Sequence, residues 1–320
     1  MTVMLDVDDV VVDYVKADRT TVRALDGATL RVKAGETVGI VGESGSGKST
    51  LGSLVGRLLP GNARYTRGSV RVEGRDVLSL DREELRTLRR ECVGFIAQDP
   101  ISALDPTMRI GRQLSLALRD SVPTAEADLI ALLERVKMRD PDRVLRLFPH
   151  EVSGGMAQRI VIAMTMARRP RVLVADEPTA ALDSNVRSEV TRLLFELAAD
   201  AGTTVLWLSH DLRSVGRWCD RVAVMYAGRV VEDGPAAQVL ERPTHPYTTA
   251  LAASDPARAR PGERIETSSI DYAVAAEVDD GDAAGSSVAD AAAGAEQAYG
   301  AVADGLTAHA TPADLRAGVR

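Results

Sequence analysis

The sequence contains very little cysteine and few aromatic residues. Its two cysteines among 320 residues, Cys92 and Cys219, stand far apart and form no CxxC pair. A disulfide framework and a zinc knuckle are therefore excluded, and we expect both cysteines to be structural residues of a protein in a reducing compartment. Aromatic residues make up only 3% of the chain, which argues against an aromatic platform for single-stranded nucleic acid.

Long apolar runs are missing as well. No segment of the sequence approaches the ~20 consecutive apolar residues that a helix needs to cross a bilayer. The first 13 residues carry four aspartates where a secretory signal would need basic residues. If the protein works at a membrane, we expect partner subunits to supply the spanning part.

The charge is distributed unevenly along the chain. The net charge is −7, and the segment from Glu266 to the end holds ten acidic residues against two arginines. This segment is also dense in alanine and glycine, so it cannot bury enough apolar area to offset its ordering entropy. We predict a folded domain over residues 1–254 and a mostly disordered acidic tail over 255–320. Within that tail, Thr311-Pro-Ala-Asp is a helix-start signal that allows a short terminal helix. A broadly basic surface for nucleic acid is not expected.

Short runs rich in valine and isoleucine alternate with helix-period stretches over the first 255 residues. Three strand patterns, at 3–13, 22–32 and 69–73, predict a small antiparallel sheet. Buried strands are predicted at 36–41, 92–97, 171–175 and 203–208. Helices are predicted from residue 48 and at 108–138, 154–169 and 185–200, with a charged surface helix at 81–90. This alternation predicts an α/β fold with a parallel sheet covered by helices.

A glycine-rich loop lies between the strand at 36–41 and the helix that follows it. The segment Gly42-Glu-Ser-Gly-Ser-Gly-Lys-Ser-Thr50 fits GxxxxGK[ST]. Glycines let backbone N–H groups wrap a phosphate, and the helix N-terminus adds positive potential. We expect Lys48 to reach the β- and γ-phosphates and Ser49 to hold Mg²⁺. The candidate nucleotide-binding residues of this loop are Gly42, Ser44, Gly45, Gly47, Lys48, Ser49 and Thr50.

Two further segments carry candidate chemistry. The strand at 171–175 ends in Asp176 and Glu177, which would lie at the sheet edge beside the phosphate loop. Asp176 is a candidate Mg²⁺ ligand, and Glu177 a candidate general base for a water that attacks the γ-phosphate. Ser153 is followed by two glycines and an apolar helix, so it predicts an N-cap and a second helix N-terminus able to bind an anion.

Ser153-Gly-Gly-Met-Ala-Gln resembles the LSGGQ-type signature of ABC ATPases, with Val152 where leucine is usual. The rest of that family's pattern appears in order over residues 1 to about 254. It comprises the adenine-stacking aromatic Tyr14, the Q-loop glutamine Gln98, the D-loop residue Asp183 and the switch histidine His210.

The resemblance implies a P-loop NTPase core with a small antiparallel β subdomain and an inserted helical subdomain. It also implies a head-to-tail dimer that holds two ATP molecules, with Ser153, Gly154 and Gly155 acting on the partner's nucleotide. ATP and Mg²⁺ are the expected cofactors. The resemblance assigns Mg²⁺ to Ser49, Gln98 and Asp176, and catalysis to Glu177, His210 and Gln98.

A finer resemblance concerns the solute. The segment that begins Gln98-Asp-Pro-Ile-Ser-Ala-Leu is similar to one in ATPases of dipeptide, oligopeptide and nickel importers. Pro149-His-Glu and His245-Pro-Tyr also fit that subfamily. The implied partners are transmembrane permease subunits, a second ABC ATPase that is identical or paralogous, and indirectly a solute-binding protein. The resemblance places this chain peripherally on the cytoplasmic face of the cell membrane. One departure is that no cysteine follows Cys219, so an iron–sulfur cluster is not expected.

Two classes of function stay open at this point. The first is a transport ATPase that powers uptake of peptides or a related small solute. The second is a non-transport ABC ATPase that acts on nucleic acid or the ribosome. Between Lys48 and Ser153 there is no long heptad run and no cysteine pair, features that repair-type ABC proteins insert there. The sequence therefore favours transport, and Glu177 and His210 argue against an inactive subunit.

Overall fold

The structure, a computed structural model, describes residues 2–119 and 122–254. The acidic segment 255–320, with its candidate helix at Thr311, lies outside the described residues, so the division at 254/255 stays a prediction. None of the helices in the described ranges is long and apolar enough to span a bilayer.

A four-stranded antiparallel sheet forms one part of the molecule. Its strands follow the order β2-β1-β4-β5. Their bounds are Val3–Val15 (β1), Thr21–Lys33 (β2), Ala63–Val72 (β4) and Arg75–Asp76 (β5). The small antiparallel sheet predicted from the sequence is confirmed, and its third strand begins six residues earlier than the predicted start at 69.

The second sheet has six strands in the order β10-β9-β3-β8-β7-β6. Five neighbouring strands pair in parallel, and β10 runs antiparallel to β9 at one edge. Every residue of β7 and β8 is buried, which explains their continuous apolar sequences. The bounds are Thr37–Val41 (β3), Val93–Ile96 (β6), Val172–Asp176 (β7), Thr204–Leu208 (β8), Arg221–Tyr226 (β9) and Arg229–Pro235 (β10).

Helices cover this sheet and extend beyond it. The helices predicted within 108–138 are α3 and α4. The bounds are Lys48–Val55 (α1), Arg82–Glu91 (α2), Ile110–Leu118 (α3), Glu126–Arg135 (α4), Pro141–Arg146 (α5), Gly154–Met166 (α6), Ser184–Ala201 (α7), Leu212–Trp218 (α8), Ala236–Glu241 (α9) and Pro246–Ala253 (α10), with a 3-10 turn at Pro149–Glu151.

The predicted surface helix at 81–90 is confirmed as α2. Asp81 caps it through the backbone N–H groups of Glu83 and Glu84, and the Glu84 side chain returns a bond to the Asp81 N–H. Leu88 is its one buried residue, so the charged residues of this helix form a solvated face, as its sequence pattern indicated.

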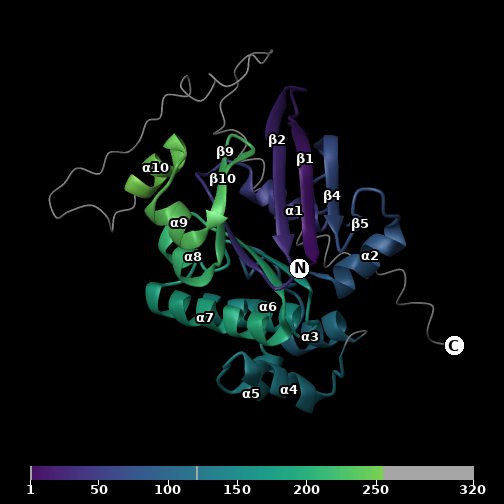
Figure 1. Cartoon of the computed structure of the whole chain (residues 1–320). Coiled ribbons are helices and arrows are strands. Elements are labelled where there is room, and N and C mark those ends of the chain that lie inside the picture. The colour runs from purple at the N-terminus through teal and green to yellow at the C-terminus, as the bar shows by residue number, and fades with distance from the viewer. Residues whose placement is uncertain (1, 120–121, 255–320) are drawn as a thin grey trace.

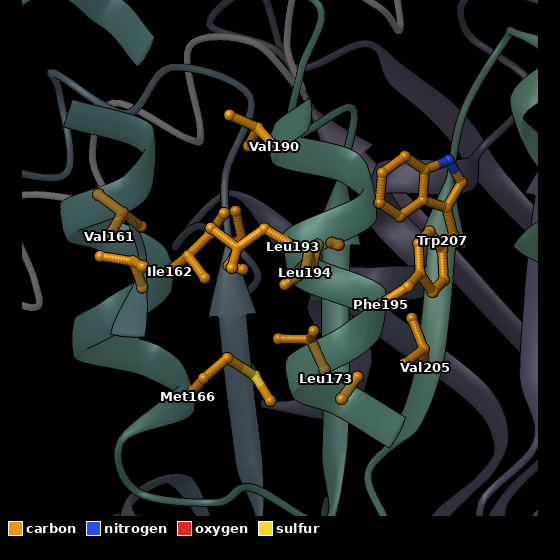
Figure 2. Close-up of a cluster of buried hydrophobic side chains, with 14 of the residues drawn as sticks. Val161, Ile162, Met166, Leu173, Val190, Leu193, Leu194, Phe195, Val205 and Trp207 are labelled. Carbon is orange, nitrogen blue, oxygen red and sulfur yellow. The ribbon is translucent and has the colours of Figure 1, made fainter. Parts of the chain in front are cut away.

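Two hydrophobic clusters hold the layers together. One joins the antiparallel sheet to the parallel sheet around α1, with Leu51, Leu54 and Val174 in its centre. The other lies between the parallel sheet and helices α6 and α7, where Phe195 and Trp207 meet with ring centroids 4.9 Å apart (Figure 2). Helices α3, α4 and α5 pack together and on α6, and Figure 1 shows α4 and α5 at the end of the molecule farthest from the antiparallel sheet. This group corresponds to the expected inserted helical subdomain.

Candidate nucleotide-binding site

The glycine-rich loop connects β3 to α1 and has a conformation that requires glycine at specific positions. Gly42 and Gly47 have φ values of 154° and 102°. A Cβ atom at Gly42 would lie 2.2 Å from the Met225 carbonyl oxygen, and one at Gly47 would lie 2.6 Å from the Ala24 carbonyl oxygen. Any side chain there would therefore force backbone atoms apart and change the shape of the loop.

Lys48 is the first residue of α1 and its side chain folds back over the loop. The ammonium donates to the carbonyl oxygens of Gly42 and Glu43, at 2.8 and 2.7 Å. Burial lowers its pKa, and the negative charges of Glu177 and Asp176 act in the opposite direction. The cation therefore lies in the loop with both predicted carboxylates within electrostatic reach.

Asp176 and Glu177 lie at the carboxyl end of β7. Asp176 pairs in register with Leu208 of β8, and β8 lies next to β3, which feeds the phosphate loop. The two carboxylates and the loop therefore share one edge of the parallel sheet. Glu177 has φ 43°, a left-handed conformation that costs a non-glycine residue about 1–3 kcal/mol. A hydrogen bond from its N–H to the Leu208 carbonyl, at 2.9 Å, holds it there.

His210 follows β8 and meets Glu177 directly. Its Nδ1 atom lies 2.7 Å from Glu177 Oε1, while its ring is largely exposed. The preceding Ser209 is buried and donates its N–H to the Ile40 carbonyl at the end of β3. Two predicted catalytic residues, 33 positions apart, therefore form one pair beside the phosphate loop.

Gln98 follows β6, the neighbour of β7 at the sheet edge. Its side chain is exposed, so it is accessible from the edge that carries Asp176. Ser44 is also exposed, and Ser49 is half-buried at the start of α1. The Mg²⁺ and catalytic roles given to these residues stay predictions.

Tyr14 is placed differently from what adenine stacking requires. Its side chain is only 6% exposed, and its hydroxyl lies 3.2 Å from Thr50 Oγ1. Burial raises its pKa, and the bond to Thr50 partly opposes that rise. The ring lies near the loop but almost no face is open to a base, so stacking needs the ring to rotate outward. The stacking of adenine on Tyr14 stays a prediction.

Ser153 and the two glycines lie at the start of α6, as predicted. The Ser153 hydroxyl accepts a hydrogen bond from the Met156 N–H at 3.3 Å and caps the helix. A Cβ atom at Gly155 would lie 2.8 Å from Val186 Cγ1 in α7. Gly155 is therefore also needed for the close approach of α6 and α7, a reason the sequence did not reveal.

Asp183 has a structural task in this chain. Its carboxylate accepts from the N–H groups of Asn185 and Val186, at 3.2 and 3.1 Å, and so caps α7. Leu182 lies 3.7 Å from the Cβ position of Gly154. The signature residues and the D-loop therefore lie side by side, while α1 with the phosphate loop packs on β2, β4, β7 and β8.

Several contacts of the loop come from residues that were not predicted from the sequence. The Gly228 N–H, in the turn between β9 and β10, donates to the Ser46 carbonyl at 3.0 Å. The Tyr247 hydroxyl in α10 accepts from the Glu43 N–H, also at 3.0 Å. The His245-Pro-Tyr segment was noticed in the sequence, but nothing local indicates that its tyrosine reaches a loop more than 200 residues earlier.

A family profile described as ABC transporter matches residues 25–180. The probable peptide ABC transporter ATP-binding protein y4tR of Sinorhizobium fredii is 43% identical over 262 residues, which cover 80% of this chain and 78% of that protein. The chain belongs to the ABC transporter family. The oligopeptide transport ATP-binding protein OppD of Salmonella typhimurium is 44% identical over 253 residues, 78% of this chain and 75% of that protein.

Solved structures agree with this membership. A dimeric ATP-binding cassette, MJ0796, in a post-hydrolysis state bound to ADP and Pi, superposes with a TM-score of 0.64 at 29% identity. The match covers 73% of this chain and 99% of that one. The ABC ATPase core predicted from the sequence is confirmed. Cassettes of this family hydrolyse ATP, and the phosphate loop, the two carboxylates and His210 are the residues of this chain suited to that reaction.

Proposed function

We propose that this ABC ATPase powers the uptake of peptides, or of a related small solute, through partner permease subunits. The observation that carries the enzymatic part is the Glu177–His210 pair, 2.7 Å apart, at the sheet edge that holds the phosphate loop. The solute class is supported by relatives whose names specify peptide and oligopeptide transport. It is also supported by the sequence similarity around Gln98 and His245.

Nucleotide binding would use the loop and α1 together. The glycines of the loop leave room for backbone N–H groups to wrap a phosphate, and the start of α1 adds the positive end of the helix dipole. The Lys48 ammonium has three N–H donors, so it can keep a bond to a loop carbonyl and still contact the β- and γ-phosphates. These groups bind and orient ATP without any covalent step, which suits phosphoryl transfer.

Mg²⁺ fits the oxygen donors at this edge. No group of three or more His, Cys, Asp or Glu side chains within the described ranges forms a metal site. Mg²⁺ is instead usually held by one or two carboxylates together with phosphate oxygens. Ser49, Asp176 and Gln98 would provide the protein ligands, and the ion would neutralise charge on the β- and γ-phosphates.

Hydrolysis would depend on Glu177 and His210. The Glu177 carboxylate would take a proton from the attacking water as it approaches the γ-phosphate. His210, hydrogen-bonded to the same carboxylate, would orient it and contact the γ-phosphate. The strained backbone of Glu177 is consistent with a residue held for function.

A second cassette would complete the site. Ser153, Gly154 and Gly155 stand at the α6 N-terminus beside the D-loop, on different elements from the phosphate loop. In a head-to-tail dimer they would contact the partner's γ-phosphate. Those contacts exist only in the closed dimer, so ATP would shift the population toward closure and hydrolysis would reverse the shift. The solved dimeric cassette supports this arrangement.

Permease subunits would dock beside Gln98. Ile101, three residues further on, is 45% exposed and is one of two large exposed hydrophobic residues in the described ranges. Its place next to the Q-loop fits a contact that passes nucleotide-driven motion to membrane helices. This docking would hold the protein at the cytoplasmic face of the membrane.

A role on nucleic acid or the ribosome is not favoured. The described helices between the phosphate loop and the signature, α2 to α5, have ten residues or fewer. They pack onto the domain and are too short to form the coiled-coil arms that repair-type ABC proteins insert at this point.

Uptake of labelled peptides by cells tests the proposal. A strain that lacks this chain is supplied with the wild-type chain or with Lys48→Ala, and accumulation of labelled dipeptides and oligopeptides is measured with a labelled amino acid as control. We expect only the wild-type chain to restore peptide uptake, with amino acid uptake unchanged. Equal peptide uptake in the strain that lacks the chain, in the strain with the wild-type chain and in the strain with Lys48→Ala would refute the solute class.

A further inference from the structure

The last described helix, α10, is fixed to the parallel sheet at its start. The Glu232 carboxylate on β10 accepts from the backbone N–H groups of Thr244 and His245, at 2.8 and 3.0 Å, and from the Thr244 hydroxyl at 2.9 Å. His245 then caps the helix, because its Nδ1 accepts from the Tyr247 N–H at 3.1 Å. These bonds set the position of Tyr247 in the first turn of α10.

Tyr247 points from α10 toward the phosphate loop. Its side chain is only 3% exposed, and its ring lies against Tyr226 at the end of β9 with centroids 4.4 Å apart. Its hydroxyl accepts a hydrogen bond from the Glu43 N–H at 3.0 Å. A buried ring on a capped helix can place this hydroxyl with little freedom.

The bond falls on a peptide group that Lys48 also uses. The Glu43 N–H and the Gly42 carbonyl belong to the same planar peptide and point in opposite directions. The carbonyl accepts from the Lys48 ammonium at 2.8 Å, while the N–H donates to Tyr247. One peptide thus links the lysine to α10, and each of the two bonds polarises and orients the other.

We propose that Tyr247 is a positioning residue that fixes the Gly42–Glu43 peptide and, through it, Lys48 and the phosphate loop. The proposal rests on nucleotide binding at this loop. Without the hydroxyl the peptide can rotate, and only part of the population keeps the Gly42 carbonyl under Lys48. The apparent nucleotide affinity falls by the fraction that stays competent.

The test replaces Tyr247 by phenylalanine in the full-length chain. Phenylalanine keeps the ring against Tyr226 and removes only the hydroxyl. We expect isothermal titration calorimetry to show roughly three- to tenfold weaker binding of MgADP, which is the effect of losing about one hydrogen bond. The KM for ATP should rise by a similar factor while kcat stays within about twofold, because saturating ATP recovers the competent loop.

Tyr65→Phe is the matched control. The Tyr65 hydroxyl donates to the Gly68 carbonyl within β4, so this variant also loses one hydrogen bond between a tyrosine hydroxyl and the backbone, but away from the loop. It should leave MgADP affinity unchanged. A Tyr247→Phe variant that lowers Tm while its MgADP affinity matches the wild type would show a structural role only and would overturn the proposal.

Glu43→Pro tests the same bond from the loop side, because proline has no N–H to donate. We expect Tyr247→Phe to cause no further loss of MgADP affinity in the Glu43→Pro background. An equal loss in both backgrounds would mean that the hydroxyl acts elsewhere. Failure of the wild-type chain to bind MgADP would refute the proposed nucleotide site. Unchanged MgADP affinity in Tyr247→Phe would refute only the role of the Tyr247 hydroxyl.

Discussion

At the level of single residues, the site depends on how Glu177 and His210 are held. Neither position is distinctive alone in the sequence. In the structure the Glu177 N–H continues the β7–β8 ladder through Leu208, and this directs its carboxylate at the His210 ring. The strained φ of Glu177 is tolerated because that ladder bond and the ring contact fix it together.

Glu177→Gln should nearly abolish turnover without abolishing nucleotide binding. The amide is similar in size but cannot take a proton from water. We expect ATP hydrolysis to fall roughly 100- to 10,000-fold, the usual weight of a general base. Phosphate release measures the turnover, and a nucleotide titration measures the binding.

The same variant should also accumulate as an ATP-bound dimer, because the closed state is left only through hydrolysis. Size-exclusion chromatography with ATP would show this species, and Lys48→Ala would serve as a control that cannot close. Wild-type turnover in Glu177→Gln would remove Glu177 from the reaction.

Both cysteines should be unreactive in the native protein. Burial, and secondarily the charge of Asp220, raises the pKa of Cys219 to about 12. Burial, followed by the hydrogen bond to Glu73, raises the pKa of Cys92. A raised pKa means less thiolate at a given pH, so a thiol reagent at pH 8 should modify neither residue until the chain is unfolded. Immediate modification of either thiol in native protein would contradict this burial.

At the level of elements, the starts of α6 and α7 combine structural and functional demands. Ser153 and Asp183 each cap one of these helices, and Gly155 lets them approach. A sequence motif gives such residues only a role in nucleotide binding. The structure adds that replacing them also changes the helices that carry them.

Asp183→Ala and Asp183→Asn separate the two roles. Alanine removes the cap and should lower stability by about 1 kcal/mol, whereas asparagine caps about as well as aspartate. For a domain of this size that corresponds to a Tm lower by about 2–4 °C in the alanine variant only.

If Asp183→Asn keeps the wild-type Tm but loses ATPase activity, the carboxylate also works across the dimer. Equal Tm values in the alanine and asparagine variants would refute the capping role.

The elements with strong periodicity were predictable, and those defined by packing were not. The runs that became β3, β7 and β8 are short, apolar and bounded by polar residues, so the sequence indicated them. β10 has mostly half-exposed and exposed residues, and it is a strand because it pairs with β9 at the sheet edge. Helices α8 and α9 have six or seven residues, too few for a clear helical period.

At the level of the whole molecule, the order of the strands brings motifs that are far apart in the sequence together in one site. β3, β8 and β7 are neighbours although their sequences lie far apart. Their carboxyl ends therefore bring the phosphate loop, His210 and the two carboxylates to one edge. The buried strand pattern already predicted the two carboxylates beside the phosphate loop. His210 was added to the site only through the resemblance, because strand order cannot be obtained from local patterns.

The covered ring of Tyr14 and the contact of Tyr247 with Glu43 show where sequence reasoning stops. Both depend on which side chains other elements bring to the loop. A tyrosine at the end of a strand looks the same in sequence whether its ring is open or buried. Relations of this kind are set by tertiary packing and were visible only in the structure.

The most direct test of the account is to isolate the protein from native membranes and identify by mass spectrometry what is bound to it. The account predicts permease subunits, a second or identical ABC ATPase and a solute-binding protein that carries a peptide or related solute. Recovery with ribosomes or DNA, and without any membrane subunit, would contradict the transport function and leave only the ATPase.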